Sequence, residues 1–375
     1  MKFKLVLIFY ILLFLALTIF SYGFVDFNFP LNPPSFLRNL VYGNRSLATM
    51  IFISIVTGLF ILYALALKNV GQKKLTDREI WQLIFVAVMI LFFSWPAFSH
   101  DIFSYIGMAK VVFFYRENPY LVMPIEFIGE PMLKFMHSAN RLVVYGPVWI
   151  LLTAIPYFLG GERLILSVFL FKALVILFYL GTAWLIWKIS KKNIYSLTFF
   201  ALNPLVMIES LVSGHNDVMM MFWVLLAINY LFQKKKILSF ISLLCSVGIK
   251  FVTIALLPFF AFHSRLKKKK LITFSVWAMY SVFFLTPLRS EIYSWYLIWV
   301  LPLASLVIQD KFIFGLTFSF SFGLLLRYTS FLYTGSWAGI TPLLKTLTTF
   351  IPPGLTLLFL MGEAIVKKRF LKNEN

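Results

Sequence analysis

Apolar runs long enough to cross a bilayer recur along almost the whole of this 375-residue chain. A spanning helix needs about 20 predominantly apolar residues, because the bilayer core holds no water to satisfy exposed backbone groups. Residues 4–23, 47–67 and 80–98 are three such runs. We therefore predict an all-α, polytopic integral membrane protein of about 10–12 transmembrane helices, in which residues 1–375 form one domain.

The placement of the charged residues supports the same interpretation. Only 13% of the residues are charged, about half the fraction typical of soluble domains, yet the formal net charge is +20. Lysine and arginine gather in short loops between apolar runs, as at 68–78, 188–192 and 234–236. Because cytoplasmic loops carry this excess, we place these loops on the cytoplasmic side of the plasma membrane. Topology thus explains the basic excess, and we predict no nucleic-acid partner.

The longest segment that is not plainly transmembrane covers residues 99–146, and we expect it on the outer side. It begins where the run 80–98 ends, at Ser99-His100-Asp101. Its stretch "FSYIGMAKVVFFY" is amphipathic, which is typical of a helix lying on the membrane interface.

Two further stretches do not fit simple spans. Residues 147–187 allow either two crossings or one crossing with a partly embedded helix. The stretch after Lys236 must leave and return between two basic clusters within about 27 residues. Two half-length helices that meet near residues 248–250 satisfy this requirement, with glycine at the break.

The polar residues that could carry chemistry are predicted to share the outer side. Ionisable groups at membrane depth are costly and are therefore functional candidates, and the inner loops offer little besides lysine and arginine. We expect a site at the outer leaflet. The candidates are His100, Asp101, Tyr105, Asn118, Tyr145, Glu209, His215, Asn216, Asp217, Lys250, Arg289, Glu291 and Tyr296.

Several candidates also have plain structural explanations. Asp101 could cap the interfacial helix or simply end a span. Asn216 or Asp217 could cap the helix that begins at "VMMMFWVLLAI". Lys250 could extend its ammonium group to either interface. His215 and Asp217 could bind a metal together, but no other histidine or acid lies at ligand spacing, so we predict no metal and no cofactor.

Five segments, taken in order over roughly residues 80–305, resemble a known family. They are "HDIFSYIGMAKVVFFYRENPY", "YGPVW", "NPLVMIESLVSGHNDVMMM", "GIKFVTIALLP" and "YSWYLIWVLP". Their order and spacing are similar to those of the bacterial polyprenyl-phosphomannose-dependent mannosyltransferases of the GT-C superfamily. The resemblance implies a GT-C-like fold and transfer of a hexose, with mannose as first choice. The donor would be a polyprenyl-phosphate sugar, and the acceptor a hydroxyl of a glycolipid or glycan at the outer leaflet.

The resemblance also implies roles for individual residues. Asp101 stands where the family has its general base, and a carboxylate there could take the acceptor's proton in a displacement with inversion. Tyr105 follows one helical turn later and could face the same cavity. Lys250, with Arg289 or Arg163, could stabilise the leaving phosphate without a metal. The remaining substrate-binding residues would be Asn118, Tyr120, Tyr145, Glu209, His215, Asn216, Asp217 and Tyr296.

One departure and two rival functions are open at this point. Relatives often have a histidine before the Trp-Tyr pair of the late outer loop, whereas residues 293–296 read Tyr-Ser-Trp-Tyr. A transporter or flippase of lipid-linked sugars would favour paired sites on both faces or an internal repeat, and the sequence shows neither. An O-antigen ligase or polymerase would favour an outer loop rich in arginine and histidine, which residues 99–146 are not.

Overall fold

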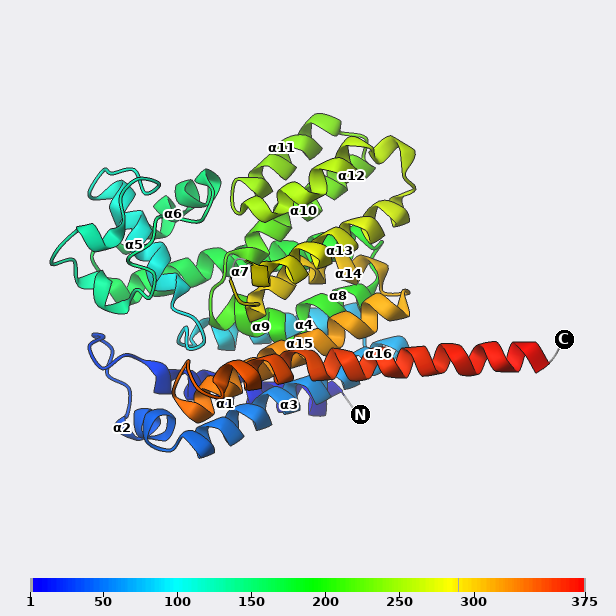
Figure 1. Ribbon diagram of the computed structural model, residues 1–375, viewed down its shortest axis with the longest axis horizontal. Helices are drawn as coiled ribbons and strands as arrows, with labels where there is room; N and C mark the ends of the chain where they lie inside the picture. Colours follow the sequence, from blue (N-terminus) through cyan, green and yellow to red (C-terminus); the bar gives the residue numbers. More distant parts are fainter. Residues whose placement is uncertain (1–2, 289, 374–375) are drawn as a thin grey trace.

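The computed structural model describes residues 3–288 and 290–373, and no strand occurs among them. The prediction of an all-α, polytopic membrane protein is confirmed. Six helices in this part of the chain are long and apolar enough to cross a membrane. They are α1 (Phe3–Ser21), α3 (Arg45–Gly71), α7 (Leu164–Ile189), α13 (Lys268–Leu285), α15 (Lys311–Thr334) and α16 (Thr341–Asn373) (Figure 1).

A seventh span results if α8 (Ile194–Ala201) is counted with the helical turns of Pro204–Val212, which include α9 (Pro204–Met207). The two pieces are bent by 54° at their break. Both totals are lower than the expected 10–12, because several predicted spans are short or broken. The shorter helices are α2 (Ser35–Arg38), α4 (Asp77–Phe92), α5 (Asp101–Phe113), α6 (Pro147–Gly160), α10 (Asp217–Phe232), α11 (Lys236–Val247), α12 (Leu257–Ala261) and α14 (Leu301–Ala304).

Helix α4 illustrates the shortening. The apolar run continues to residue 98, but the helix ends at Phe92. Pro96 disfavours helical geometry at Trp95, and the chain continues without regular structure to His100. After residue 146 the structure has one short helix, α6, followed by one full span, α7, which corresponds to the second of the two expected arrangements.

The two predicted half-length helices are present. Helix α11 ends at Val247, and a 3₁₀ turn, Phe251–Leu256, leads into α12. The break between them packs on the first residues of α6: the backbone N–H of Gly146 donates to Ile249 O at 2.9 Å, and that of Val148 donates to Gly248 O at 2.8 Å. A Cβ on Gly146 would lie 2.3 Å from Gly248 O, so this approach requires glycine.

The helix predicted within residues 99–146 is present as α5, but it does not have the one exposed face expected of an amphipathic helix. Every residue of α5 from Ile102 to Ala109 is buried, because α5 packs against α6, α7 and the 3₁₀ turn Pro131–Phe135. The helix ends at Phe113, ahead of the Asn-Pro-Tyr sequence of residues 118–120. Helix α5 is therefore part of the packed body rather than an amphipathic surface helix.

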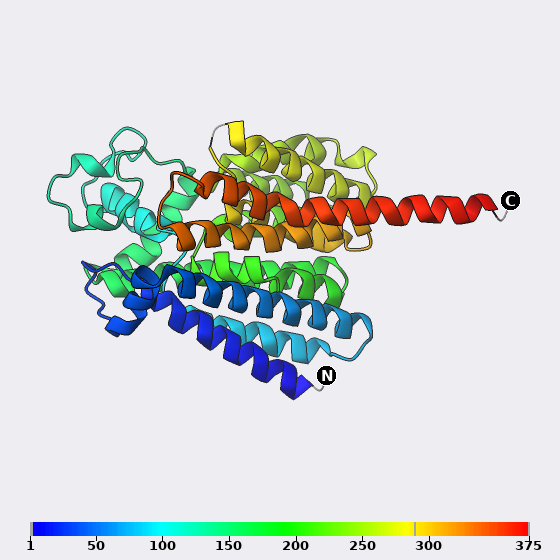
Figure 2. The same cartoon turned by 60° about the horizontal axis from the view of Figure 1, so that its bottom comes forward.

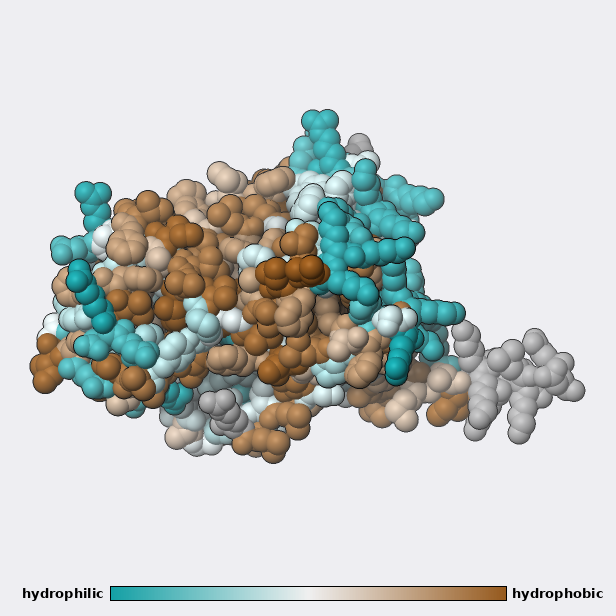
Figure 3. Space-filling view, turned by 90° about the horizontal axis from the view of Figure 1, so that it is seen from above, coloured by the Kyte–Doolittle hydropathy of each residue, from teal (hydrophilic) through white to brown (hydrophobic). Residues whose placement is uncertain are grey.

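The two ends of the helix bundle differ. Helix α1 begins, α3 ends and α16 ends at one end, whereas the 99–146 segment and the turn between α15 and α16 lie at the other (Figures 1 and 2). A space-filling view shows apolar side chains over the middle of the molecule and hydrophilic ones gathered toward both ends (Figure 3). This banding is the pattern of an integral membrane protein.

Candidate active site

Asp101 is the first residue of α5 and remains accessible. Its backbone N–H donates to Ser99 Oγ at 3.1 Å, and its carboxylate lies at the helix N-terminus, which stabilises negative charge. Its side chain is 29% exposed. The structure therefore places this residue where a substrate can reach it.

A row of polar side chains leads inward from Asp101. Nδ1 of His215 lies 3.3 Å from the Asp101 carboxylate, and Nε2 of the same ring lies 3.4 Å from Glu209. Tyr328 completes the row, because its hydroxyl donates to Glu209 Oε1 at 2.8 Å. His215 and Glu209 are fully buried. Asp101 is thus the accessible end of a buried acid–histidine–acid row.

The backbone turn at Gly214 brings His215 to this position. Gly214 has φ +73°, a left-handed conformation that favours glycine. A Cβ there would also press against Ile102 in the first turn of α5, at 3.2 Å. The backbone N–H of His215 donates to Glu209 O at 2.9 Å and closes the loop. The "SGHND" sequence is therefore built to hold a histidine beneath Asp101.

The pKa of the Asp101 carboxyl is lowered from its ordinary value. Burial alone raises it, but the interaction with His215 and the charge of Lys250 outweigh burial. Asp101 is therefore ionised at neutral pH. His100 itself stacks on His137 at 3.7 Å between ring centroids, and burial lowers the pKa of His100 to about 4. His100 is neutral at physiological pH and contributes no charge there.

An aromatic column covers one face of the His215 ring. Trp295 stacks on the imidazole with 4.0 Å between ring centroids, and Tyr293 stacks on Trp295 at 4.6 Å. Tyr293 and Trp295 belong to the late Tyr-Ser-Trp-Tyr segment, residues 293–296. The late segment meets the His-Asn-Asp sequence through these stacked rings.

Asp217 and Lys250 form a second cluster, next to Asp101. Nζ of Lys250 lies 2.8 and 2.7 Å from the two carboxylate oxygens of Asp217, and Trp299 Nε1 donates to the same carboxylate at 2.6 Å. Lys250 also lies over the Tyr145 ring, 5.6 Å from its centroid, and Tyr296 stacks on Trp299 at 4.2 Å. Lys250 is therefore paired with Asp217 and does not extend to an interface.

Asn216 occupies the N-cap position of α10, but its side chain makes no capping hydrogen bond. Asp217 turns its carboxylate to Lys250, so the predicted capping role is wrong for both residues. Both polar atoms of the buried Asn216 amide lack a partner among the described residues. Its backbone N–H donates to Tyr105 Oη at 3.4 Å. Tyr105 is buried against Tyr145 and Trp149.

Other predicted site residues lie apart from this core. Asn118 Oδ1 accepts from the Tyr120 backbone in a local turn, and the Tyr120 hydroxyl donates to Tyr145 O at 3.0 Å. Arg163 is exposed just before α7. Arg289 lies outside the described residues. Of this group, only Tyr120 is tied to a core residue.

Sequence reasoning missed Lys172, which is fully buried in α7. Its ammonium group donates to Leu91 O at 3.0 Å and to both the carbonyl and the hydroxyl of Ser94, at the end of α4. A single lysine inside an apolar run was a readable signal, because such a charge is costly in a membrane. Trp299 and Tyr328 were also missed, and only their three-dimensional contacts reveal them.

Within residues 3–288 and 290–373, no group of three or more His, Cys, Asp or Glu side chains is placed to hold a metal ion. The acids at this site are instead contacted by histidine, lysine, tryptophan and tyrosine. The arrangement can accept a proton at Asp101 and bind hydroxyl groups near Asn216.

The chain was compared with known proteins. Residues 10–265 match the family model described as alpha-(1→6)-mannopyranosyltransferase, N-terminal domain, which is more than half of the chain. No curated protein matches the chain, and no solved structure does. The match includes Asp101, His215 and Lys250 and confirms the resemblance seen in the sequence. The chain therefore belongs to the alpha-(1→6)-mannopyranosyltransferase family, and it is a membrane-embedded glycosyltransferase.

Proposed function

We propose that this mannosyltransferase takes mannose from a polyprenyl-phosphate donor and passes it to a glycolipid or glycan on the outer side of the plasma membrane. The family description gives the sugar and an α-(1→6) linkage, so the accepting group is a 6-hydroxyl. The outer orientation is supported by the positions of the basic loops, which fit the cytoplasmic side.

The single observation that carries the mechanism is the contrast in access along the Asp101–His215–Glu209 row. Asp101 is 29% exposed, whereas His215 and Glu209 are fully buried. A general base must come within hydrogen-bond reach of the proton that it accepts. Of these three groups, only Asp101 meets this requirement without rearrangement, so it is the base.

Transfer then proceeds as one displacement. The acceptor hydroxyl loses its proton to Asp101 as its oxygen bonds to the anomeric carbon. The bond from that carbon to the lipid-phosphate oxygen breaks, and the leaving phosphate takes the electron pair. Attack opposite the leaving group inverts the anomeric configuration.

The buried residues position the base and the sugars. His215 holds the Asp101 carboxylate from behind, while Glu209 and Tyr328 fix the imidazole ring. The unpartnered amide of Asn216 is suited to sugar hydroxyls, since a buried polar group without a partner costs about 1–3 kcal/mol until it is satisfied. Lys250, held in place by Asp217, is the cation of this site that would stabilise the charge of the leaving phosphate.

The test incubates the purified protein with polyprenyl-phosphomannose or polyprenyl-phosphoglucose and a set of mannoside acceptors. We expect transfer from the mannose donor and almost none from Asp101→Asn. Glu117→Gln is the matched control, because Glu117 is an exposed acid of the same outer segment. Equal activity of Asp101→Asn and the wild type would refute the assignment of Asp101 as the general base. Preference for the glucose donor would refute the assignment of mannose as the transferred sugar.

A further inference from the structure

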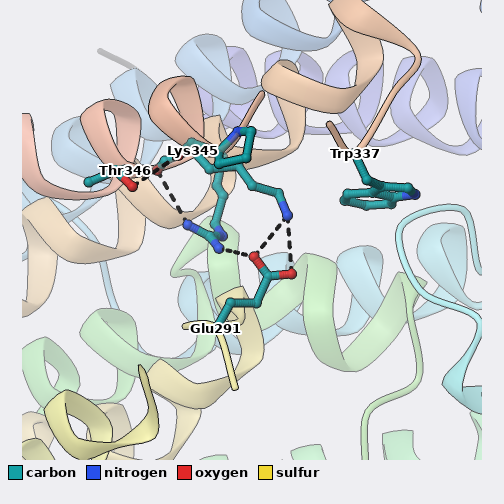
Figure 4. Close-up of a pocket in the computed structure, with 6 residues that line it drawn as sticks. Glu291, Trp337, Lys345 and Thr346 are labelled. Carbon is teal, nitrogen blue, oxygen red and sulfur yellow. Dashed lines mark hydrogen bonds and ion pairs between the residues drawn. The ribbon is translucent and has the colours of Figure 1, made fainter. Parts of the chain in front are cut away.

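A second polar cluster lies at the same end of the molecule, outside the region that matches the family. It forms an open cavity of about 410 Å³, drawn in Figure 4. The α15–α16 hairpin contributes most of the wall, and the segment before the Tyr293–Trp295 column contributes the rest. The lining residues are Glu291, Arg327, Trp337, Pro342, Lys345 and Thr346.

The cavity carries an excess of positive charge. The side chains of Arg327 and Lys345 are each only 11% exposed, and both face one carboxylate, that of Glu291. Nζ of Lys345 lies 2.8 and 3.1 Å from the Glu291 oxygens, and Arg327 Nη2 donates to Oε2 of the same carboxylate. One carboxylate balances one of these two cations, so a full positive charge remains in a partly desolvated space.

The two cations are held in place independently of Glu291. Arg327 Nη1 donates to Lys345 O at 3.3 Å and to Thr349 Oγ1 at 3.2 Å. Nζ of Lys345 lies 4.4 Å from the centroid of the Trp337 ring, which in turn stacks on Phe331 at 4.1 Å. The cations belong to the α15–α16 hairpin, whereas Glu291 comes from a different segment. Removal of Glu291 therefore leaves a preformed cation pair.

We infer that the Arg327–Lys345 pair is a binding site for a phosphate ester carried by a lipid, with Glu291 as an internal competitor for the two cations. A guanidinium beside an ammonium group suits phosphate oxygens, and the cavity is large enough for a phosphate with its ester linkage.

The rim of the cavity favours a lipid over a free anion. Trp337, which lines the cavity, is 60% exposed. Ile340 on the same turn and Leu343 in the first turn of α16 are 58% and 57% exposed. Tryptophan and exposed apolar side chains next to a charged site are typical of a membrane interface, where a lipid headgroup and its chain are recognised together. A phospholipid headgroup and a polyprenyl phosphate share this chemistry.

The cavity adjoins the active site but is a separate site. Tyr328, the neighbour of Arg327, donates to Glu209, and Tyr293, two residues after Glu291, stacks over Trp295. Lipid binding here does not require the transfer reaction. Its test therefore measures binding alone, and its outcome is independent of the base assignment.

The experiment counts bound lipid on the purified full chain by native mass spectrometry. The probes are polyprenyl monophosphate, phosphatidylglycerol, neutral phosphatidylcholine and inorganic phosphate, added separately. We expect one of the two lipid phosphates to bind more tightly than phosphatidylcholine and inorganic phosphate. Lys345→Gln should weaken that binding about tenfold, because one charge-assisted hydrogen-bond donor is lost. Glu291→Gln should strengthen it.

Controls separate a binding site from a structural ion cluster. Lys311→Gln removes a lysine from an exposed ion pair elsewhere and should leave binding unchanged. Thermal unfolding verifies that each variant is folded. If Lys345→Gln does not fold, Arg327→Gln is used in its place. Weaker binding in Glu291→Gln would overturn the proposal, as would inorganic phosphate binding as tightly as the lipids. Tighter binding of either polyprenyl monophosphate or phosphatidylglycerol supports the proposal and identifies which lipid carries the phosphate.

Discussion

Asp101 and Asp217 lie at the same end of the molecule and belong to neighbouring clusters, yet their surroundings are opposite. Asp217 is fully buried, and its two oxygens accept from Lys250 and from Trp299. Asp101 is 29% exposed, and its one ion-pair contact in the described chain is to His215, at 3.3 Å. Both residues fall within the matched family region.

In the proposed mechanism, this difference separates a structural acid from a reactive one. The lone pairs of Asp217 are occupied and its charge is balanced, so it holds together the start of α10, the break after α11 and the late segment that carries Trp299. Asp101 retains lone pairs that face the accessible side and can accept a proton. The number of donors around a carboxylate, rather than its membership of a motif, distinguishes the two roles.

The largest effect is expected for Asp101→Asn, which should lower kcat by about 10²–10⁴-fold, the usual contribution of a positioned general base. The melting temperature should stay close to that of the wild type, because Asp101 is partly exposed. Parallel measurements of kcat and thermal unfolding provide the test. A variant that loses activity only in proportion to its loss of folded protein would place Asp101 in the structural class with Asp217.

The second prediction concerns Lys250→Met. This change leaves the Asp217 carboxylate buried without its cation, and breaking one partner of a buried pair typically costs about 3–5 kcal/mol. We expect a clear loss of stability in thermal or denaturant unfolding. Asp217→Asn combined with Lys250→Met should recover part of it, since no unpaired charge remains. An unchanged melting temperature in Lys250→Met would contradict the structural role of the pair.

The contrast between the two acids also shows what sequence could and could not predict. The helical class, the half-length helices around Gly248 and the position of Asp101 at a helix start follow from local patterns of apolar residues and glycine. The capping role considered for Asn216 was wrong, and the pairing of Lys250 with Asp217 was not predicted. Those outcomes depend on contacts such as Lys250 with Asp217, which join residues 33 positions apart and leave no local signature.

The prediction of an amphipathic surface helix at α5 was wrong for a similar reason. Its sequence alternates apolar and polar side chains, which is compatible with a surface helix. The structure covers its polar face as well: Ser104 is buried and its hydroxyl lies 2.8 Å from Ser138 Oγ, and Tyr105 Oη accepts from the Asn216 backbone. Polar residues that find partners in distant segments cannot be distinguished in sequence from polar residues that face water.

A third, smaller effect is a change in pH dependence in His215→Gln. Burial raises the pKa of Asp101 and the interaction with His215 is the largest influence that lowers it. Loss of the imidazole therefore raises the pKa of the carboxyl, and the acid limb of the kcat/KM profile should move to higher pH. His137→Gln is the control, because His137 stacks on His100 rather than contacting Asp101. Coincident acid limbs in His215→Gln and the wild type would show that His215 does not control the base.

The smallest effect is expected from a chelator. Both acids are contacted by nitrogen donors of this chain, and negative charge on the leaving phosphate can be stabilised by lysine and arginine instead of a divalent ion. Transfer activity should therefore be the same with EDTA as without it. Activity that disappears with EDTA and returns with added Mg²⁺ or Mn²⁺ would mean that a divalent ion, rather than lysine and arginine alone, stabilises the leaving phosphate. The role of Lys250 beside Asp217 would then be structural only, whereas the assignment of Asp101 as the base would stand on its own test.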